Sequence, residues 1–214
     1  MNLILASSSP RRREILSYLS IPFEVCSAPV DETPRPHEPP REMVMRLSRL
    51  KAEAAMRSCP AADTLVLAAD TTVALDGENI GKPTDGAEAR AMLKRLRGRA
   101  HQVFTAVTFA PAPFDARGLW VALCETRVHM RPYADADIED YLATGEPFDK
   151  AGAYAIQDSA FHPVERIEGC YLNVMGLPLC EVIRGLQGFN AANGAREPAL
   201  HGCLSADGQP CIHS

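Results

Sequence analysis

The amino-acid sequence predicts an α/β protein, in which a sheet is flanked by helices. Residues 64–69 form a nearly continuous apolar run, which is typical of a strand buried on both faces. A shorter apolar run lies at residues 3–6. Between the two runs, apolar residues recur at helical spacing from Met43 to Ala54, which predicts a helix with one apolar stripe.

Composition limits the possible functions. The 214 residues are 46% hydrophobic, enough for one large domain or two packed lobes. A net charge of -5 argues against a nucleic-acid surface, which needs a basic face, but allows a phosphorylated ligand held by a few cations. No apolar stretch is long enough to span a membrane, and we expect no signal peptide. The 7 cysteines lack paired spacing, so we expect reduced thiols in a cytoplasmic protein.

The first helix has a clear start signal. A strand at residues 3–6 is followed at once by three serines, a proline and three arginines. Ser9 is a good N-cap and Pro10 suits the first helical position, so we predict a helix from Pro10 to Leu19.

The next segments are shorter or rich in proline. Residues 21–26 predict a second strand, and residues 29–40 form a proline-rich stretch. This stretch carries Asp31 and Glu32, and it is either a plain surface loop or an acidic loop that faces a site.

The central strand is predicted to end at Asp70, after which the chain resumes at residues 73–75 and turns at 76–79 with hairpin chemistry. Strands and helices continue beyond this turn. We predict strands at about 101–109, 119–129, 163–167 and 171–175, helices at about 85–98, 134–143 and 178–187, and a glycine-punctuated segment at 145–157.

The chain after the last predicted helix is small, polar and rich in turn residues, so we predict a flexible tail at 188–214. His201, Cys203, Cys211 and His213 in this tail could bind a metal, but their spacing matches no usual zinc pattern.

The start of the first helix is a candidate phosphate site. Free backbone N–H groups and the helix dipole favour an anion there. Ser7, Ser9 and the guanidinium groups of residues 11–13 add donors that match phosphate oxygens. The alternative is an ordinary capped helix with surface arginines.

Three further residues support a phosphate site. Lys51 lies beside the apolar stripe of its helix, so it must reach water or find a partner. Asp70 could bind a divalent cation or take a proton from water. Lys82 lies between a glycine and a proline, where the backbone is fixed and the side chain can be directed toward a site. Taken singly, each could be an ordinary surface or capping residue. Together they provide the cations and the carboxylate that phosphoryl chemistry needs, without a P-loop or a Rossmann glycine motif.

At these residues the chain resembles the Maf family of nucleotide pyrophosphatases, distant relatives of the inosine triphosphate pyrophosphatases. The resemblance runs from about Leu3 to Leu186. Its motifs are Leu5-Ala6-Ser7-Ser8-Ser9-Pro10-Arg11-Arg12, Val30-Asp31-Glu32, Arg46-Leu47 with Lys51-Ala52, Ala69-Asp70-Thr71, Gly81-Lys82-Pro83, Asp149-Lys150-Ala151-Gly152-Ala153-Tyr154, Ile156-Gln157 and Val174-Met175-Gly176-Leu177-Pro178.

The resemblance implies a fold like that of the inosine triphosphate pyrophosphatases, with a twisted mixed sheet and two lobes around a central cleft. It implies a Maf-like domain at 1–187 that hydrolyses a nucleoside triphosphate to the monophosphate and diphosphate. It also implies a divalent cation, Mg²⁺ or Mn²⁺, and a homodimer. Asp70 is similar to the family's proton acceptor, and with Glu32 to its metal-binding residues. The implied phosphate-binding residues are Ser7, Ser9, Arg12, Lys51 and Lys82.

The subfamily follows from three positions. Arg11, Thr71 and Gln157 resemble the specificity residues of the branch that acts on dTTP and UTP. The branch that acts on 7-methyl-GTP carries other residues at all three, although residues 32–35 resemble that branch, and Asp158 stands where the first branch usually has glycine. The alternatives are a 7-methyl-GTP pyrophosphatase, a nucleotidyltransferase, and a non-catalytic nucleotide-binding regulator of septum formation.

Overall fold

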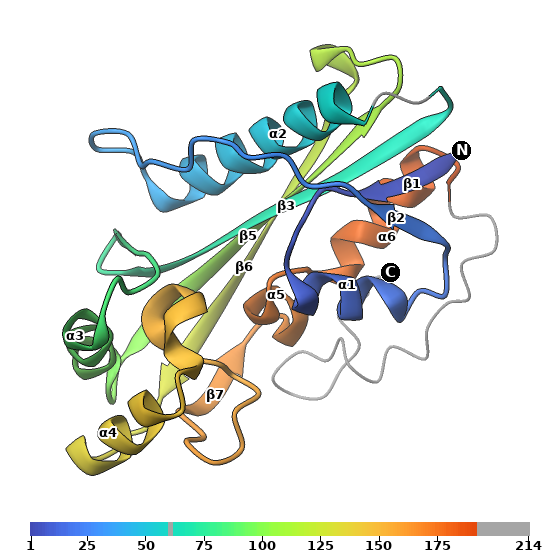
Figure 1. The fold of residues 1–214 in the computed structure, drawn as a ribbon. Helices are drawn as coiled ribbons and strands as arrows, with labels where there is room; N and C mark the ends of the chain where they lie inside the picture. The colour runs from blue at the N-terminus through green and yellow to red at the C-terminus, as the bar shows by residue number, and fades with distance from the viewer. Residues whose placement is uncertain (60–61, 192–214) are drawn as a thin grey trace.

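The computed structural model describes residues 1–59 and 62–191 of the chain. Within them, one sheet of seven strands has the order β2-β1-β3-β5-β6-β7, and β4 pairs with β3 (Figure 1). The strands are β1 (Asn2–Leu5), β2 (Phe23–Val25), β3 (Thr64–Leu75), β4 (Glu78–Ile80), β5 (Ala100–Pro111), β6 (Trp120–Met130) and β7 (Val164–Glu168). The helices are α1 (Pro10–Ser17), α2 (Pro40–Ser58), α3 (Gly86–Leu96), α4 (Asp135–Ala143), α5 (Tyr171–Met175) and α6 (Leu179–Gly188), with 3-10 turns at Ala116–Gly118, Glu146–Asp149 and Ala151–Ala153.

The sheet is mixed because two kinds of connection build it. β1 pairs in parallel with β2 and β3, since α1 and α2 carry the chain back between these strands. β3, β5, β6 and β7 pair antiparallel in succession. The predicted α/β class, with a mixed sheet flanked by helices, is confirmed.

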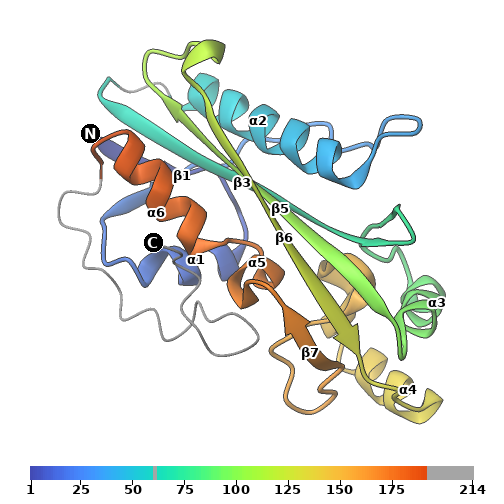
Figure 2. The same ribbon diagram turned by 180° about the vertical axis from the view of Figure 1, so that it is seen from behind.

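Helices cover both faces of the sheet, and the core has several parts. α2 lies on one face, while α1, α5 and α6 lie on the other, as the two opposite views show (Figures 1 and 2). Leu67 and Phe109 pack under α1 and α6, and Val66 packs under α2. A separate cluster around Val73 and Leu93 forms the core beside α3 and α4. The buried apolar side chains of the described residues thus form four clusters along the same long strands.

One edge of β3 is interrupted where the site lies. β1 pairs with residues 64–67 and β4 pairs with residues 73–75 on the same edge of β3. Among the described residues, no strand pairs with residues 68–72 on this edge. The chain leaves β1 at Ala6 and turns into α1, so a cleft opens against the middle of β3.

Two predicted strands differ from the structure. β3 does not end at Asp70 but runs to Leu75, because the β-branched residues at 71–73 continue the strand and Lys51 neutralises the buried carboxylate. Residues 171–175 form helix α5 instead of a strand. Its Asn173 side chain donates to the Val103 carbonyl at 3.0 Å, a contact from a distant strand that local propensity cannot reveal.

The prediction of reduced cysteines is wrong for one pair. A disulfide joins Cys26 to Cys59, which lie 33 positions apart in the sequence. The Cys26 N–H donates to the Leu5 carbonyl at 3.1 Å, and Cys59 caps the end of α2. Both side chains pack against the same apolar cluster under α2, so tertiary structure brings together two residues that no sequence spacing connects.

The predicted tail lies almost wholly outside the described residues, and so do His201, Cys203, Cys211 and His213. None of the helices within residues 1–59 and 62–191 has the length and apolar character needed to cross a membrane.

Candidate active site

A cleft of about 380 Å³ opens beside the unpaired edge of β3. Its walls come from the turn before α1, the segment after β2, α2, β3, the loop after β4, the segment at 149–157, and α5. All ten predicted site residues line it. They are Ser7, Ser9, Arg11, Arg12, Glu32, Lys51, Asp70, Thr71, Lys82 and Gln157.

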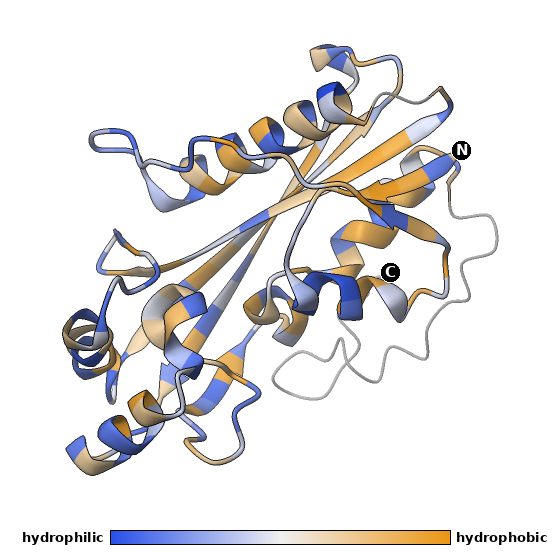
Figure 3. Ribbon diagram, in the orientation of Figure 1, coloured by the Kyte–Doolittle hydropathy of each residue, from blue (hydrophilic) through white to orange (hydrophobic). Residues whose placement is uncertain are grey.

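The serine turn is built as the sequence predicts. Ser9 is the N-cap of α1, and its hydroxyl accepts from the Arg12 N–H at 3.4 Å. The Ser7 hydroxyl accepts from the Ser9 N–H at 3.2 Å, which bends the chain away from β1. A loop connects the largely hydrophobic β1 to the hydrophilic start of α1 (Figure 3). Serine hydroxyls and the helix start therefore line one wall of the cleft.

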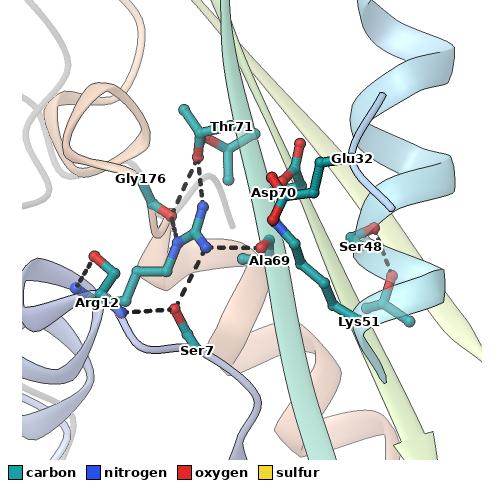
Figure 4. Close-up of polar contacts among 12 residues, drawn as sticks. Ser7, Arg12, Glu32, Ser48, Lys51, Ala69, Asp70, Thr71 and Gly176 are labelled. Atoms are coloured by element: carbon teal, nitrogen blue, oxygen red, sulfur yellow. Dashed lines mark hydrogen bonds and ion pairs between the residues drawn. The ribbon is translucent and has the colours of Figure 1, made fainter. Parts of the chain in front are cut away.

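Arg12 binds several walls of the cleft to one another (Figure 4). Its Nε donates to the Gly176 carbonyl at 2.9 Å, and Nη2 donates to the Thr71 hydroxyl at 3.0 Å. Nη1 donates to the Ala69 carbonyl at 2.8 Å, which lies on the unpaired edge of β3, and to the Ser7 hydroxyl at 3.5 Å. Burial lowers the pKa of Arg12, and the negative charges of Asp70 and Glu32 oppose that effect.

Asp70 and Lys51 form a close ion pair at the centre of the cleft. Lys51 Nζ lies 2.5 Å from Asp70 Oδ1, and the Asp70 side chain is 7% exposed. Burial raises the pKa of the Asp70 carboxyl, while the charges of Lys51 and Arg12 lower it. The lysine that the sequence places beside an apolar stripe has therefore found a partner rather than reaching into solvent.

β3 divides the cleft because its side chains alternate between the two faces of the sheet. Asp70 faces α2 and Lys51, whereas Thr71 faces α1 and Arg12 (Figure 4). The Thr71 hydroxyl also pairs with the Thr105 hydroxyl at 2.9 Å. The adjacent residues Asp70 and Thr71 therefore place their side chains on two different walls of the cleft.

Glu32 reaches the same lysine from the proline-rich segment. Its Oε1 lies 3.1 Å from Lys51 Nζ, and its side chain is 58% exposed. Glu32 therefore faces the cleft, as the second interpretation of this segment expects.

The opposite wall comes from the segment at 149–157 and the loop that carries Lys82. The Gly152 N–H donates to the Gly81 carbonyl at 3.0 Å, which fixes the residue before Lys82. Arg11 reaches across to Asp149, with 3.5 Å between Nη1 and Oδ2. Gln157 lines this wall with an exposed side chain.

Sequence reasoning missed one buried cation of this wall. Lys150 is 6% exposed, and its Nζ lies 2.6 Å from Asp149 Oδ1 and 2.8 Å from Glu146 Oε2. The available signal was its place inside a motif that carried the family resemblance. Lys150 ties the segment together beneath the cleft.

The donors present in the cleft fit a hard divalent cation. Among the described residues, no group of three or more His, Cys, Asp and Glu side chains could hold a metal. Mg²⁺ in phosphate sites, however, commonly takes only one or two carboxylates together with substrate phosphates. Asp70 and Glu32, which share Lys51, provide two such carboxylates.

The described residues form a mixed α/β protein whose cleft is lined by arginine and lysine side chains around one buried carboxylate. A family model described as Maf-like protein matches residues 2–189. The chain belongs to the Maf family.

Curated relatives are similar over most of their length. The chain is 47% identical over 190 residues to a dTTP/UTP pyrophosphatase of Citrifermentans bemidjiense, covering 89% of this chain and 96% of that one. It is 50% identical over 180 residues to a dTTP/UTP pyrophosphatase of Chromobacterium violaceum, covering 83% and 89%. Among solved structures, the Staphylococcus aureus Ham1 protein matches with a TM-score of 0.45 and 16% identity, covering 62% of this chain and 73% of that one.

Proposed function

We propose that this protein is a pyrophosphatase that hydrolyses dTTP and UTP to the monophosphate and diphosphate. The observation that carries the proposal is the Lys51–Asp70 pair, a buried carboxylate held 2.5 Å from a cation inside a cleft lined by further cations. The names of the two relatives described above, at 47% and 50% identity, support this substrate class.

In this proposal Asp70 accepts the proton of the attacking water. The water oxygen forms a bond to the α-phosphorus, the bond between that phosphorus and the bridging oxygen to the β-phosphate breaks, and diphosphate leaves with the electron pair. A carboxylate can take this proton only when it is ionised and within hydrogen-bond reach of the water. The charge of Lys51 favours that ionised form.

The phosphate chain binds to Ser7, Ser9, Arg12, Lys51 and Lys82. Serine hydroxyls and cations stabilise the charge that develops on the phosphate oxygens. Arg12 has five N–H donors, and four of its contacts already go to other described residues. Its proposed role therefore combines one bond to the substrate with holding the cleft walls in place.

We assign Asp70 and Glu32 as the residues that would hold Mg²⁺ or Mn²⁺. The cation, when bound, neutralises charge on the phosphates and lowers the electrostatic barrier to attack. Lys51 keeps the two carboxylates close together at distances of 2.5 and 3.1 Å, which supports this assignment.

Base selection is assigned to Arg11, Thr71 and Gln157. The Gln157 amide can donate and accept at once, which suits the edge of a pyrimidine. Thr71 is bonded to Arg12 and Thr105, so its proposed contribution is to shape the pocket. We also infer a homodimer, with a role in clearing modified pyrimidine nucleotides and in cell-division arrest. Light scattering tests the dimer.

The experiment is a panel of triphosphates, including dTTP, UTP and 7-methyl-GTP, incubated with Mg²⁺ or Mn²⁺ and resolved by chromatography. We expect turnover of dTTP and UTP with release of diphosphate, loss of turnover with a chelator, and no need for an acceptor substrate. Asp70→Asn should abolish turnover while leaving the circular dichroism spectrum unchanged. Release of orthophosphate, preference for 7-methyl-GTP, or tight binding without product would each contradict the proposal.

A further inference from the structure

The segment between β2 and α2 is fastened to α2 near both of its ends. At its start, Cys26 is bonded to Cys59 at the end of the helix. Near its end, Glu38 pairs with Arg46 inside the helix. Figure 1 shows this segment lying along α2 before it turns into the helix. Glu32 lies between the two attachments.

The Arg46–Glu38 pair is bidentate and partly buried. Arg46 Nε lies 2.5 Å from Glu38 Oε1, and Nη2 lies 2.6 Å from Glu38 Oε2. The side chains are 15% and 8% exposed. The guanidinium makes a further bond from Nη2 to the Thr33 carbonyl at 3.2 Å. Arg46 therefore holds both the end of the segment and the residue next to Glu32.

The same helix carries the other partner of Glu32. Lys51 follows Arg46 by five positions on α2, and its Nζ lies 3.1 Å from Glu32 Oε1. A rigid helix thus fixes the distance between the point that holds Thr33 and the ammonium that meets Glu32. Neither Arg46 nor Glu38 lines the cleft.

We propose that Arg46 and Glu38 are positioning residues, which hold Glu32 at the Lys51–Asp70 pair without touching the substrate. This inference rests on the proposed function for the consequence, but its structural part can be tested separately.

A gain in folding stability alone does not explain why this ion pair is present. Removing two charges from water costs free energy that their attraction only partly offsets. The planar guanidinium instead fixes the positions of its partners, because its rigid fork of donors can bind a carboxylate and a carbonyl in fixed directions. An exposed pair on the same helix, Arg57 with Glu53 at 2.7 Å, has one contact and reaches no other segment within the part of the chain that the structure describes. It is the matched control.

The first test measures kinetics. Arg46→Gln should lower kcat/KM for dTTP by about 10- to 100-fold, the usual range for residues that orient a metal or catalytic ligand. In a chain that already carries Glu32→Gln, the same change should lower it less than threefold, because there is no carboxylate left to position. Arg46→Lys should restore little, and Arg57→Gln should leave the rate unchanged. Equal losses in both backgrounds, or full rescue by lysine, would overturn the proposal.

The second test does not depend on activity. The Arg35 N–H donates to Glu38 Oε2 at 3.1 Å, so its hydrogen exchange reports the attachment. Arg46→Gln should speed exchange in peptides covering residues 29–39, and Arg57→Gln should not. Unchanged exchange overturns the positioning role even if the enzyme is active. Faster exchange in a protein that hydrolyses no triphosphate would leave the attachment standing and reject the proposed function.

Discussion

The ammonium of Lys51 lies 2.5 Å from Asp70 Oδ1, where the carboxylate is almost fully buried. The same ammonium contacts Glu32 at 3.1 Å. One cation from α2 therefore meets two carboxylates from two other segments, and its charge lowers the pKa of the buried Asp70 against the larger effect of burial.

Replacing this cation should change the pH dependence of the reaction. Burial raises the pKa of Asp70, and Lys51 is the first of the groups that oppose the rise. In Lys51→Met the opposing charge is lost, so the pKa rises further and the proton acceptor is ionised only at higher pH. We expect the acid limb of the kcat/KM profile to move to higher pH, with a loss of maximal rate because a phosphate ligand is also gone. An acid limb at the wild-type position would show that Asp70 is not the group that titrates.

Gln157 should affect substrate choice more than the chemical step. Gln157→Glu removes the amide donors and leaves only acceptors. We expect KM for dTTP and UTP to rise about tenfold, as for the loss of one hydrogen bond to a neutral partner, with kcat changed much less. Steady-state kinetics with both nucleotides measure this, and Gln157→Asn is the control for side-chain length. Equal falls in kcat for both nucleotides would place Gln157 in the chemical step instead.

Gly185 in α6 should be sensitive to a single methyl group. A Cβ at this position would lie 2.2 Å from Phe109 Cε2, and Phe109 is fully buried. Gly185→Ala should lower the free energy of unfolding by about 1–3 kcal/mol through overpacking, despite alanine's higher helix propensity. Gly188→Ala in the same helix has nothing within 4 Å of its Cβ and should be neutral or slightly stabilising. Thermal unfolding of both variants provides the comparison.

The Cys26–Cys59 bond should be detectable and should contribute to stability. Closing a loop across 33 positions stabilises a fold by about 4 kcal/mol in the chain-entropy model. We expect peptide mapping without reductant to find the cross-linked pair, and a dithiol to lower the melting temperature. Cys26→Ser should remove the effect of the dithiol. Identical melting curves with and without reductant would contradict the assignment of this disulfide.

Glu38 should make folding sensitive to acid. Hydrogen bonds from Arg46 hold the pKa of Glu38 at about 2, below its ordinary value of 4.5. A depressed folded-state pKa gives stability that is present above the ordinary value and is lost as the pH falls toward the depressed value. Glu38→Gln should therefore be less stable than wild type at pH 7, by about 1 kcal/mol. Denaturant titrations should show that this difference shrinks as the pH falls from about 4.5 to 2.

Local sequence signals predict those features of the fold that depend on residues close together in the chain. Ser9 and Pro10 begin α1 because capping is a matter of a few positions, and the apolar stripe from Met43 to Ala54 lies within α2. The ten site residues could be assigned to one cleft because their motifs matched a family together. Their contacts with one another could not be predicted, because they join segments far apart in the chain.

The errors have the same origin. The apolar run of residues 64–69 stops before Asp70, which predicts the end of a strand there, but Lys51 from another element makes the buried carboxylate tolerable inside β3. Residues 171–175 have strand propensity, but Asn173 is held by the strand that contains Val103. No sequence signal connects Arg46 with Glu38, because two charged residues eight positions apart meet only when one of them lies in a loop that folds back.

The interrupted edge of β3 has a further consequence for how the chain can change. Asp70 and Thr71 face opposite walls because pairing with β1 and β5 fixes the register of β3 from Thr64 onward. Deleting or inserting one residue before Asp70 would exchange the faces of every later side chain. The acid would then point toward Arg12 and the threonine toward Lys51. A change of length that a surface loop tolerates would here exchange the sides of the sheet on which the acid and the threonine lie. The chemistry of this protein is therefore tied to the length of one strand.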